Sequence, residues 1–307
     1  MLKFFEDDWL TFNVEKDSSG LAKKVLAWNI SDDVRIAPGT LLDSMIGVTR
    51  RMDLGDAPYV SLSGGVDSQA VCLLLREAGI DFNIAIMRFE GCHNSMDVDH
   101  AFEFCNKHRL KYKVIDIDLM SFLVRDLYKY ATKYKCPSPQ FNTHFKFYEK
   151  LIDLGATSIL AGGQAPFFVN NELEYHATRS QNAWTTFAEV NSFKLYGNFL
   201  GWSFDMAAPL IIATPNIGER SEAVALRYKA KIQGMKALGI DVTPQDKKYT
   251  GFEYFKEHLA EITGDGWSFE RSFRYPYSDK LPDYLGVLKR PLISDELLRL
   301  NLEFNNL

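Results

Sequence analysis

The sequence predicts an α/β fold built on a doubly wound parallel sheet, with a short β-rich extension before it and a mainly helical region after it. Two observations support this prediction. Between Pro58 and Gly163, short and almost continuously apolar segments alternate with segments of helical periodicity, which is typical of a parallel sheet covered on both faces. The chain has 307 residues, 46% of them hydrophobic and 24% charged, so it can bury a large core.

The first part of the chain predicts two strands and one helix. The strands are expected at residues 9–14 and 23–30, where β-branched and aromatic residues are frequent. Thr40 can cap a helix that runs to about Asp53, because apolar side chains recur behind it at helical spacing. We therefore expect residues 1–57 to form a β-rich stub plus a helix.

Residues 58–166 predict four strands and the helices between them. Strands are expected at 59–63, 82–89, 112–118 and 157–163, and helices at 68–78, 95–108, 119–134 and 143–154. In open parallel sheets, ligands bind beyond the carboxyl ends of the strands. The polar clusters of this region all lie at the carboxyl ends of predicted strands, at 63–68, 88–93, 116–118 and 162–164.

After Pro166 the alternation of strands and helices ends in the sequence pattern. Residues 167–307 are rich in aromatic residues and turn signals, and their clearest predicted helix is 217–238. We expect a mainly helical region that packs against the sheet and serves substrate binding or oligomerisation. No motif there identifies the substrate.

Bulk properties exclude several classes of protein. The net charge of −5 creates no overall field that attracts nucleic acid. The four cysteines form no CxxC pair, so neither a disulfide framework nor a zinc knuckle is expected. No apolar run approaches the roughly 18 residues needed to span a bilayer, and acidic residues follow the start at once. We expect a cytoplasmic protein with no membrane partner.

The most informative segment is 63–68, Ser-Gly-Gly-Val-Asp-Ser, at the junction of a predicted strand and its helix. Glycines let the backbone approach a ligand closely, and the free N–H groups of a first helical turn bind phosphate. Ser63 and Ser68 add hydroxyl donors, while Asp67 predicts a bridging Mg²⁺ because a carboxylate alone repels phosphate. On spacing alone, the alternative is a simple tight turn in which Asp67 only favours a helix N-terminus.

This segment resembles the PP-loop of the ATP pyrophosphatases, a superfamily of adenine nucleotide alpha hydrolase-like proteins on a Rossmann-like (HUP) sheet. The family pattern is Ser-Gly-Gly-x-Asp-Ser after the first strand, and all five fixed positions match in residues 63–68. The superfamily includes asparagine synthetase, NAD synthetase, GMP synthetase, tRNA thiolases and queuosine-pathway enzymes. The resemblance implies ATP and Mg²⁺ as cofactors, attack of a substrate oxygen on the α-phosphate, release of pyrophosphate, and displacement of AMP by a nitrogen or sulfur nucleophile.

The resemblance also implies a set of site residues. Asp67 and Ser63 are the expected catalytic residues, and Asp67 is the expected metal contact. The expected nucleotide contacts are Ser61, Leu62, Ser63, Gly64, Gly65, Val66, Asp67, Ser68, Met87, Gly162 and Gly163. In the family the glycine loop holds the pyrophosphate end, and backbone groups around Ser61, Leu62 and Met87 frame the adenine.

Within the superfamily, residues 39–165 look most like the synthetase domain of asparagine synthetase-like proteins. That domain usually carries an acid in the turn after its fourth strand, whereas this chain has Ala-Gly-Gly-Gln-Ala at 161–165. Asp116 and Asp118 are the candidates for a second carboxylate. We expect no glutaminase domain, so an amide nitrogen would come from ammonia or from an amine substrate.

Two other functions stay open. One is a PP-loop enzyme that modifies tRNA or a nucleobase by thiolation or amidation, for which Cys92 or Cys136 could carry sulfur, unless both are inert thiols. RNA would need a basic patch, and the candidates are Arg227, Lys229, Lys231, Lys236, Lys247 and Lys248, whose alternative is a solvated helix face. The other function is a nucleotide-binding or structural protein without turnover, which the missing acid at 161–165 favours.

The remaining candidates are weaker. His100 and His108 are read as a solvated helix face rather than a zinc site, and Cys72 and Cys105 as core residues. Arg271 and Arg274 could clamp a carboxylate or phosphate. A small-molecule substrate is the expected partner, and the sequence leaves a homodimer open.

Overall fold

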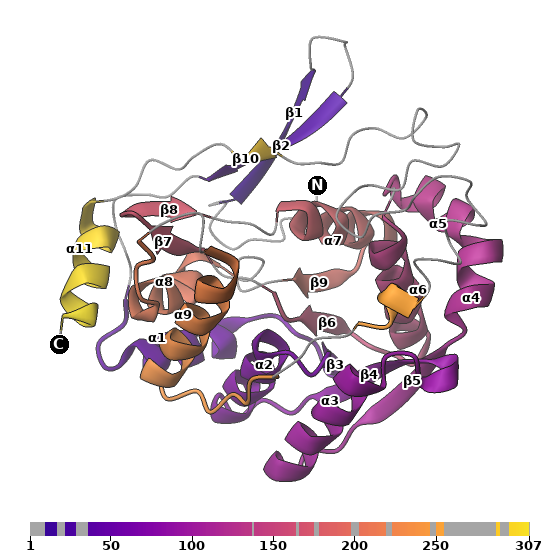
Figure 1. Cartoon of the computed structure of the whole chain (residues 1–307), viewed down its shortest axis with the longest axis horizontal. Coiled ribbons are helices and arrows are strands. Elements are labelled where there is room, and N and C mark those ends of the chain that lie inside the picture. Colours follow the sequence, from indigo (N-terminus) through magenta and orange to yellow (C-terminus); the bar gives the residue numbers. More distant parts are fainter. Residues whose placement is uncertain are drawn as a thin grey trace.

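The prediction of an α/β fold with a parallel sheet is confirmed by a computed structural model of the chain (Figure 1). The structure describes residues 10–16, 22–28, 36–136, 138–163, 166–174, 178–197, 203–218, 223–245, 250–254, 287–288 and 295–306. Within these residues, no helix is long and apolar enough to cross a membrane.

The central sheet has five parallel strands in the order β5-β4-β3-β6-β9. The strands are β3 (Pro58–Ser61), β4 (Asn83–Phe89), β5 (Lys113–Ile117), β6 (Ser158–Ala161) and β9 (Lys194–Gly197). The chain starts in the middle at β3, adds β4 and β5 on one side, and then returns to add β6 and β9 on the other. The reversal places a topological switch point at the carboxyl ends of β3 and β6, which is where open α/β sheets bind ligands.

Helices cover both faces of the sheet because successive side chains of each strand point to opposite faces. Val60 and Ile84 belong to one buried cluster, and their neighbours Tyr59 and Ala85 belong to the other. The first cluster includes residues of α1 (Leu41–Arg51), α2 (Val66–Glu77), α3 (Ser95–His108), α8 (Phe204–Ala213) and α9 (Ala223–Ala237). The second includes residues of α4 (Leu119–Ser121), η2 (Phe122–Asp126), α5 (Leu127–Tyr134), α6 (Pro139–Asp153) and α7 (Thr178–Asn191).

Several helix bounds follow from local sequence signals. Thr40 caps α1 as predicted: its hydroxyl accepts the Asp43 N–H at 3.1 Å, and the Asp43 carboxylate accepts the Thr40 N–H at 2.9 Å. This reciprocal arrangement is a capping box. The helix predicted at 95–108 is α3 with the same bounds, and the helical segment predicted at 119–134 comprises α4, the π-helical turn η2 and α5.

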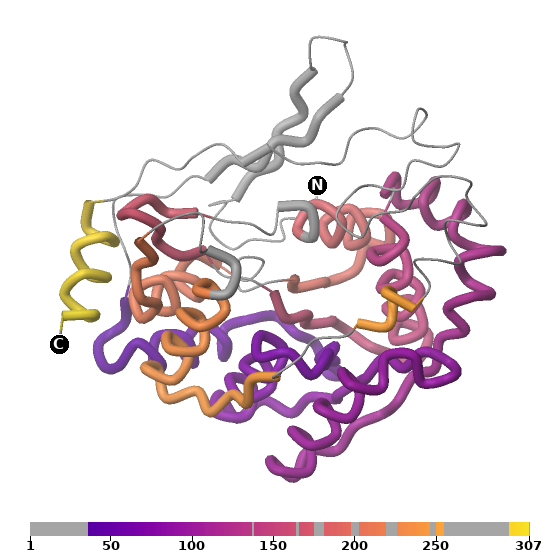
Figure 2. The backbone as a smooth tube through the Cα atoms, viewed as in Figure 1, coloured from indigo at the N-terminus to yellow at the C-terminus, as the bar shows by residue number. Residues whose placement is uncertain are grey.

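Smaller elements complete the described structure. β1 (Leu10–Lys16) and β2 (Ala22–Trp28) pair antiparallel, as the two predicted strands of the stub suggest, and β10 (Val287–Leu288) adds to β2 in parallel. The short helix η1 (Glu90–Cys92) follows β4. α11 (Asp295–Asn305), yellow in Figure 2, contacts α8. The carboxamide of Asn301 on this helix donates to the carbonyls of Ile211, Ile212 and Thr214 at 3.0, 3.1 and 2.9 Å.

Contrary to the sequence pattern, short strands follow Pro166 within the mainly helical region. β7 (Phe167–Val169) and β8 (Glu172–Glu174) form an antiparallel pair, and β9 adds a fifth strand to the sheet. The sequence pattern did not predict β9, because it is a four-residue edge strand, Lys-Leu-Tyr-Gly, that is only partly buried. The division of the chain at residues 57 and 166 into three regions stays a prediction.

The helix predicted at 217–238 begins later than expected. Ile217 instead pairs with the β7 strand, because its N–H donates to the Phe168 carbonyl at 3.0 Å and its carbonyl accepts the Asn170 N–H at 2.8 Å. The described helix, α9, starts at Ala223.

Candidate functional site

The glycine loop connects β3 to α2 at the switch point of the sheet. The N–H of Leu62 donates to the carbonyl of Ala85 at 3.0 Å and so holds the start of the loop on β4. Gly64 has φ +77°, in the left-handed region that favours glycine, and a Cβ there would stand 2.5 Å from the carbonyl oxygen of Asp97. Conformation and space therefore both require glycine at position 64.

Hydroxyl groups close the loop on itself. Ser68 Oγ accepts the N–H of Ser63 at 3.2 Å and donates to the carbonyl of Gly65 at 2.9 Å, and the two serine hydroxyls lie 3.3 Å apart. Gly65 is the N-cap of α2 and has no side chain to accept the first N–H groups of the helix. These donors and the positive end of the helix dipole suit an anionic ligand.

Gly162, in the turn after β6, packs directly against the first turn of α2. A Cβ at Gly162 would overlap the backbone nitrogen of Ser68 and come within 2.9 Å of the carbonyl carbon of Asp67. The structure thus brings the predicted contact Gly162 to the glycine loop, and Gly163 follows it, partly exposed. Gln164 and Ala165 lie outside the described residues.

Asp67 and Lys231 form an ion pair that joins the loop to α9. Lys231 Nζ lies 2.6 Å from Asp67 Oδ2, and the two side chains are only 15% and 19% exposed. The other oxygen, Asp67 Oδ1, is buried without a hydrogen-bond partner in the described part of the chain. Because an unpaired buried carboxylate oxygen is costly, a cation beside Oδ1 would stabilise this arrangement. Mg²⁺ fits, since proteins usually bind it with one or two carboxylates, phosphate oxygens and water.

The basic side chains of α9 fall into two groups, one that faces solvent and one that faces the site. Lys229 and Lys236 are exposed, as a solvated helix face predicts, but Lys231 points to Asp67 and lies 5.6 Å from the ring centroid of Tyr228. Arg227 lies 5.9 Å from the ring centroid of Phe167. The sequence alone did not single out Lys231 within the basic run. Its partner comes from a loop 164 residues earlier.

Predicted adenine contacts lie at the ends of β3 and β4. Ser61 ends β3, and burial raises the pKa of Tyr148, with which the Ser61 side chain interacts. The carbonyl of Met87 accepts the side-chain amide of Asn94 at 2.9 Å, and Asn94 in turn accepts the N–H of Phe89 at 2.8 Å. Asn94 is buried and shapes the turn after β4, a role that the sequence reasoning missed.

Both candidates for a second carboxylate have other partners. Arg88 Nε and Nη2 donate to the carboxylate of Asp116 at 2.6 and 2.9 Å, and this bond holds the pKa of Asp116 below its usual value. Asp118 caps α4 by accepting the N–H of Ser121 at 2.9 Å. In the described part of the chain, neither Asp116 nor Asp118 contacts Asp67. Neither therefore supplies beside Asp67 the second carboxylate that the 161–165 turn lacks.

The cysteines separate into one exposed and three buried thiols. Burial raises the pKa of Cys105 and Cys136 to about 12 and that of Cys72 well above its ordinary value, so these three thiols are inert. Cys92, in the turn after β4, is exposed and has φ 58°.

The expectation that His100 lies on a solvated helix face is wrong. Its side chain is 14% exposed, and Nε2 lies 3.0 Å from the carbonyl oxygen of Thr243. His108 is partly buried, and burial together with Arg76 lowers its pKa. Within the described residues, no group of three or more His, Cys, Asp or Glu side chains could hold a metal ion.

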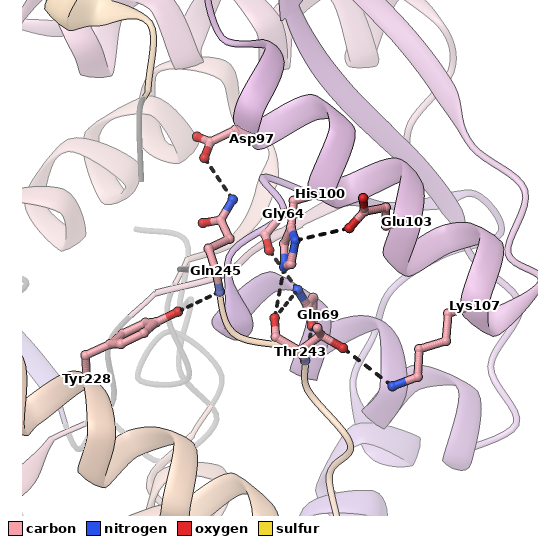
Figure 3. A network of polar contacts seen from close by, with 9 residues as sticks. All are labelled: Gly64, Gln69, Asp97, His100, Glu103, Lys107, Tyr228, Thr243 and Gln245. Atoms are coloured by element: carbon pink, nitrogen blue, oxygen red, sulfur yellow. Dashed lines mark hydrogen bonds and ion pairs between the residues drawn. The ribbon is translucent and has the colours of Figure 1, made fainter. Parts of the chain in front are cut away.

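Sequence reasoning also missed residues 240–245, which contact α2 and α3 next to the loop (Figure 3). No periodicity or motif marks this segment. The one available signal was Gln69, a polar residue on an otherwise apolar helix face directly after the loop. Lys247, Lys248, Arg271 and Arg274 lie outside the described residues.

No protein-family model and no curated protein matches this chain. Among solved structures, it is similar to a predicted subunit of tRNA methyltransferase from Methanocaldococcus jannaschii DSM, with 14% identity, 70% of this chain and 94% of that chain covered, and a TM-score of 0.39. It is also similar to NMN synthetase from Francisella tularensis, with 12% identity, coverage of 89% and 94%, and a TM-score of 0.40. Likeness at this level carries no argument about function, which must come from the residues of the site.

Proposed function

We propose that this chain is an enzyme of the PP-loop ATP pyrophosphatase superfamily that binds ATP with Mg²⁺ at the β3–α2 loop and transfers AMP to a substrate oxygen, with release of pyrophosphate. One observation carries the proposal. The Ser-Gly-Gly-Val-Asp-Ser segment lies at the switch point of a parallel sheet, one buried oxygen of its carboxylate has no hydrogen-bond partner among the described residues, and a lysine lies 2.6 Å from the other oxygen.

The residues of the loop have distinct roles in this proposal. The N–H groups at the start of α2 and the Ser63 hydroxyl bind the β- and γ-phosphates, where negative charge accumulates as pyrophosphate leaves. Asp67 would hold Mg²⁺ through its unpaired oxygen, and the ion would supply positive charge to the departing pyrophosphate. Lys231 offsets the charge of Asp67, and its ammonium group would be available to donate to a phosphate oxygen of the bound nucleotide.

The second half of the reaction depends on the acceptor. We favour displacement of AMP by ammonia or an amine, as in asparagine synthetase-like synthetase domains. A second candidate is transfer of sulfur to a nucleobase or tRNA, because the Cys92 thiol is exposed in the turn after β4, next to the predicted adenine side. A protein that binds nucleotide without turnover is the third candidate, since Asp116 and Asp118 are both engaged elsewhere.

Product analysis tests the proposal. The protein is incubated with ATP labelled at the α-phosphate, Mg²⁺, ammonia or an amine, and mixtures of candidate acceptors, and labelled AMP and unlabelled pyrophosphate are quantified separately. We expect both products in equal amounts, and we expect Asp67→Ala to abolish them. Lys229→Met, an exposed position on the same helix as Lys231, the partner of Asp67, should leave both products unchanged.

Each outcome discriminates among the candidates. ADP and inorganic phosphate as products would refute the proposal. Binding of ATP without release of AMP or pyrophosphate would favour the protein without turnover. RNA that copurifies at low salt and dissociates at high salt would favour the tRNA-modifying candidate.

A further inference from the structure

The segment 240–245 is held beside the glycine loop by polar side chains from three helices, α2, α3 and α9 (Figure 3). On α3, His100 Nε2 lies 3.0 Å from the Thr243 carbonyl oxygen, and Asp97 Oδ1 accepts the side-chain amide of Gln245 at 3.0 Å. Ile240 and Val242 of the segment are buried. The segment therefore packs as part of the core around the loop.

Gln69 of α2 connects this segment to the loop itself. Its side chain is fully buried. Nε2 donates to the Gly64 carbonyl at 2.7 Å and to the Thr243 carbonyl at 3.0 Å, while Oε1 accepts the Thr243 N–H at 2.7 Å. Because Thr243 binds both ends of the carboxamide, it fixes which end faces Gly64. The side-chain NH2 group of Gln69 is therefore held against the Gly64 carbonyl.

The bond to Gly64 also determines where the next N–H points. The described residues contain no cis peptide bond, and in a trans peptide the C=O and the following N–H point in opposite directions. Since the Gly64 carbonyl points inward to the buried Gln69, the N–H of Gly65 points away from it, toward the outer side of the loop. Gly64 is free of side-chain restraints, so without this bond its peptide could rotate.

We propose that Gln69 is a positioning residue of the nucleotide site: it holds the Gly64–Gly65 peptide with its N–H directed at the phosphates, and Thr243 locks the carboxamide in the orientation this requires. The inference rests on the proposed function, because it assumes that phosphates occupy the loop. A side chain that merely fastened the segment 240–245 would stabilise the fold without changing how phosphates are recognised.

A comparison of two nucleotides separates these roles. Gln69→Met keeps the side-chain volume and removes the donor to Gly64, and Gln69→Glu keeps an acceptor for the Thr243 N–H but sets a carboxylate against two carbonyls. We expect the affinity for Mg·ATP, measured by calorimetric titration, to fall about tenfold in either variant, equivalent to about 1.4 kcal/mol. The affinity for AMP should stay unchanged, because AMP lacks the phosphates that this loop would bind.

Asn301→Leu is the matched control, because it removes another buried carboxamide that donates to backbone carbonyls, on α11. We expect it to lower stability and to leave the ratio of the ATP and AMP affinities unchanged. Equal losses for ATP and AMP in the Gln69 variants, or no loss, would overturn the inference. If the wild-type protein does not bind Mg·ATP, the proposed function fails, and the inference fails with it.

A measurement on the wild-type protein avoids the risk that both variants fail to fold. Phosphates that fix the Gly64–Gly65 peptide should also tighten Gln69 against Thr243, since the two bonds share one carboxamide. We expect Mg·ATP, but not AMP, to slow hydrogen exchange of the Thr243 amide severalfold. An exchange rate that Mg·ATP leaves unchanged while it binds would count against the inference and leave the proposed function intact.

Discussion

Replacing Lys231 by methionine removes the positive end of the ion pair with Asp67 and leaves a carboxylate that is 19% exposed without its partner. Loss of one member of a buried pair costs about 3–5 kcal/mol, because the remaining charge stays desolvated. With both side chains at 15–19% exposure, we expect the lower end, about 3 kcal/mol. Asp67→Asn should cost a similar amount, since it leaves Lys231 unpaired.

A double-mutant cycle measures the pair itself. If the two side chains interact as the 2.6 Å separation indicates, the variant with both substitutions should be little less stable than either single variant, which gives a coupling of about 3 kcal/mol. Free energies of unfolding come from urea titration at low and high salt, with Lys229→Met as the exposed control. Additive effects, with a coupling below about 0.5 kcal/mol, would refute the ion pair and the place assigned to Lys231 in the site.

Three further predictions concern the surroundings of the loop. Gly162→Ala should lower stability by about 1–3 kcal/mol through overpacking and abolish ATP binding, because the added Cβ would overlap the backbone of α2. Gly218→Ala is the control: a Cβ at Gly218 meets open space, so this variant should be nearly neutral in unfolding and titration experiments. Native-state labelling with a thiol reagent, followed by mass spectrometry, should modify Cys92 and spare the other cysteines, which are buried; rapid labelling of any other cysteine would contradict the described core. Arg88 lowers the pKa of Asp116 from its ordinary value, so the pair stabilises the fold above about pH 4 and loses that contribution as the pH falls through the folded pKa; Arg88→Met should remove this small contribution of an exposed pair from the pH dependence of unfolding.

What the sequence predicted well rests on local signals. The loop at 63–68 could be placed because strand, glycines and helix are contiguous, and α1 because Thr40 and Asp43 form a capping box within one turn. The α3 helix kept its predicted bounds because its periodicity is complete within the segment. In each case the information and the structure occupy the same few residues.

What the sequence did not predict depends on distant partners. Lys231 meets Asp67 across 164 residues, and Gln69 meets Thr243 across 174. No local pattern identifies the partner of either residue: a lysine on a helix is usually solvated, and the polar Gln69 on an apolar helix face gives no sign of which distant group it contacts. β9 was missed for a related reason: its four residues become a strand only through pairing with β6.

The most direct test of the central claim is a crystal structure with Mn²⁺ in place of Mg²⁺ and a non-hydrolysable ATP analogue in which a methylene group replaces the oxygen that bridges the α- and β-phosphates. We predict an anomalous peak for Mn²⁺ bonded to Asp67 Oδ1, and β- and γ-phosphate oxygens within hydrogen-bond distance of the N–H groups that begin α2. Nucleotide bound elsewhere, or a metal that does not contact Asp67, would contradict the assignment of this loop as the ATP site.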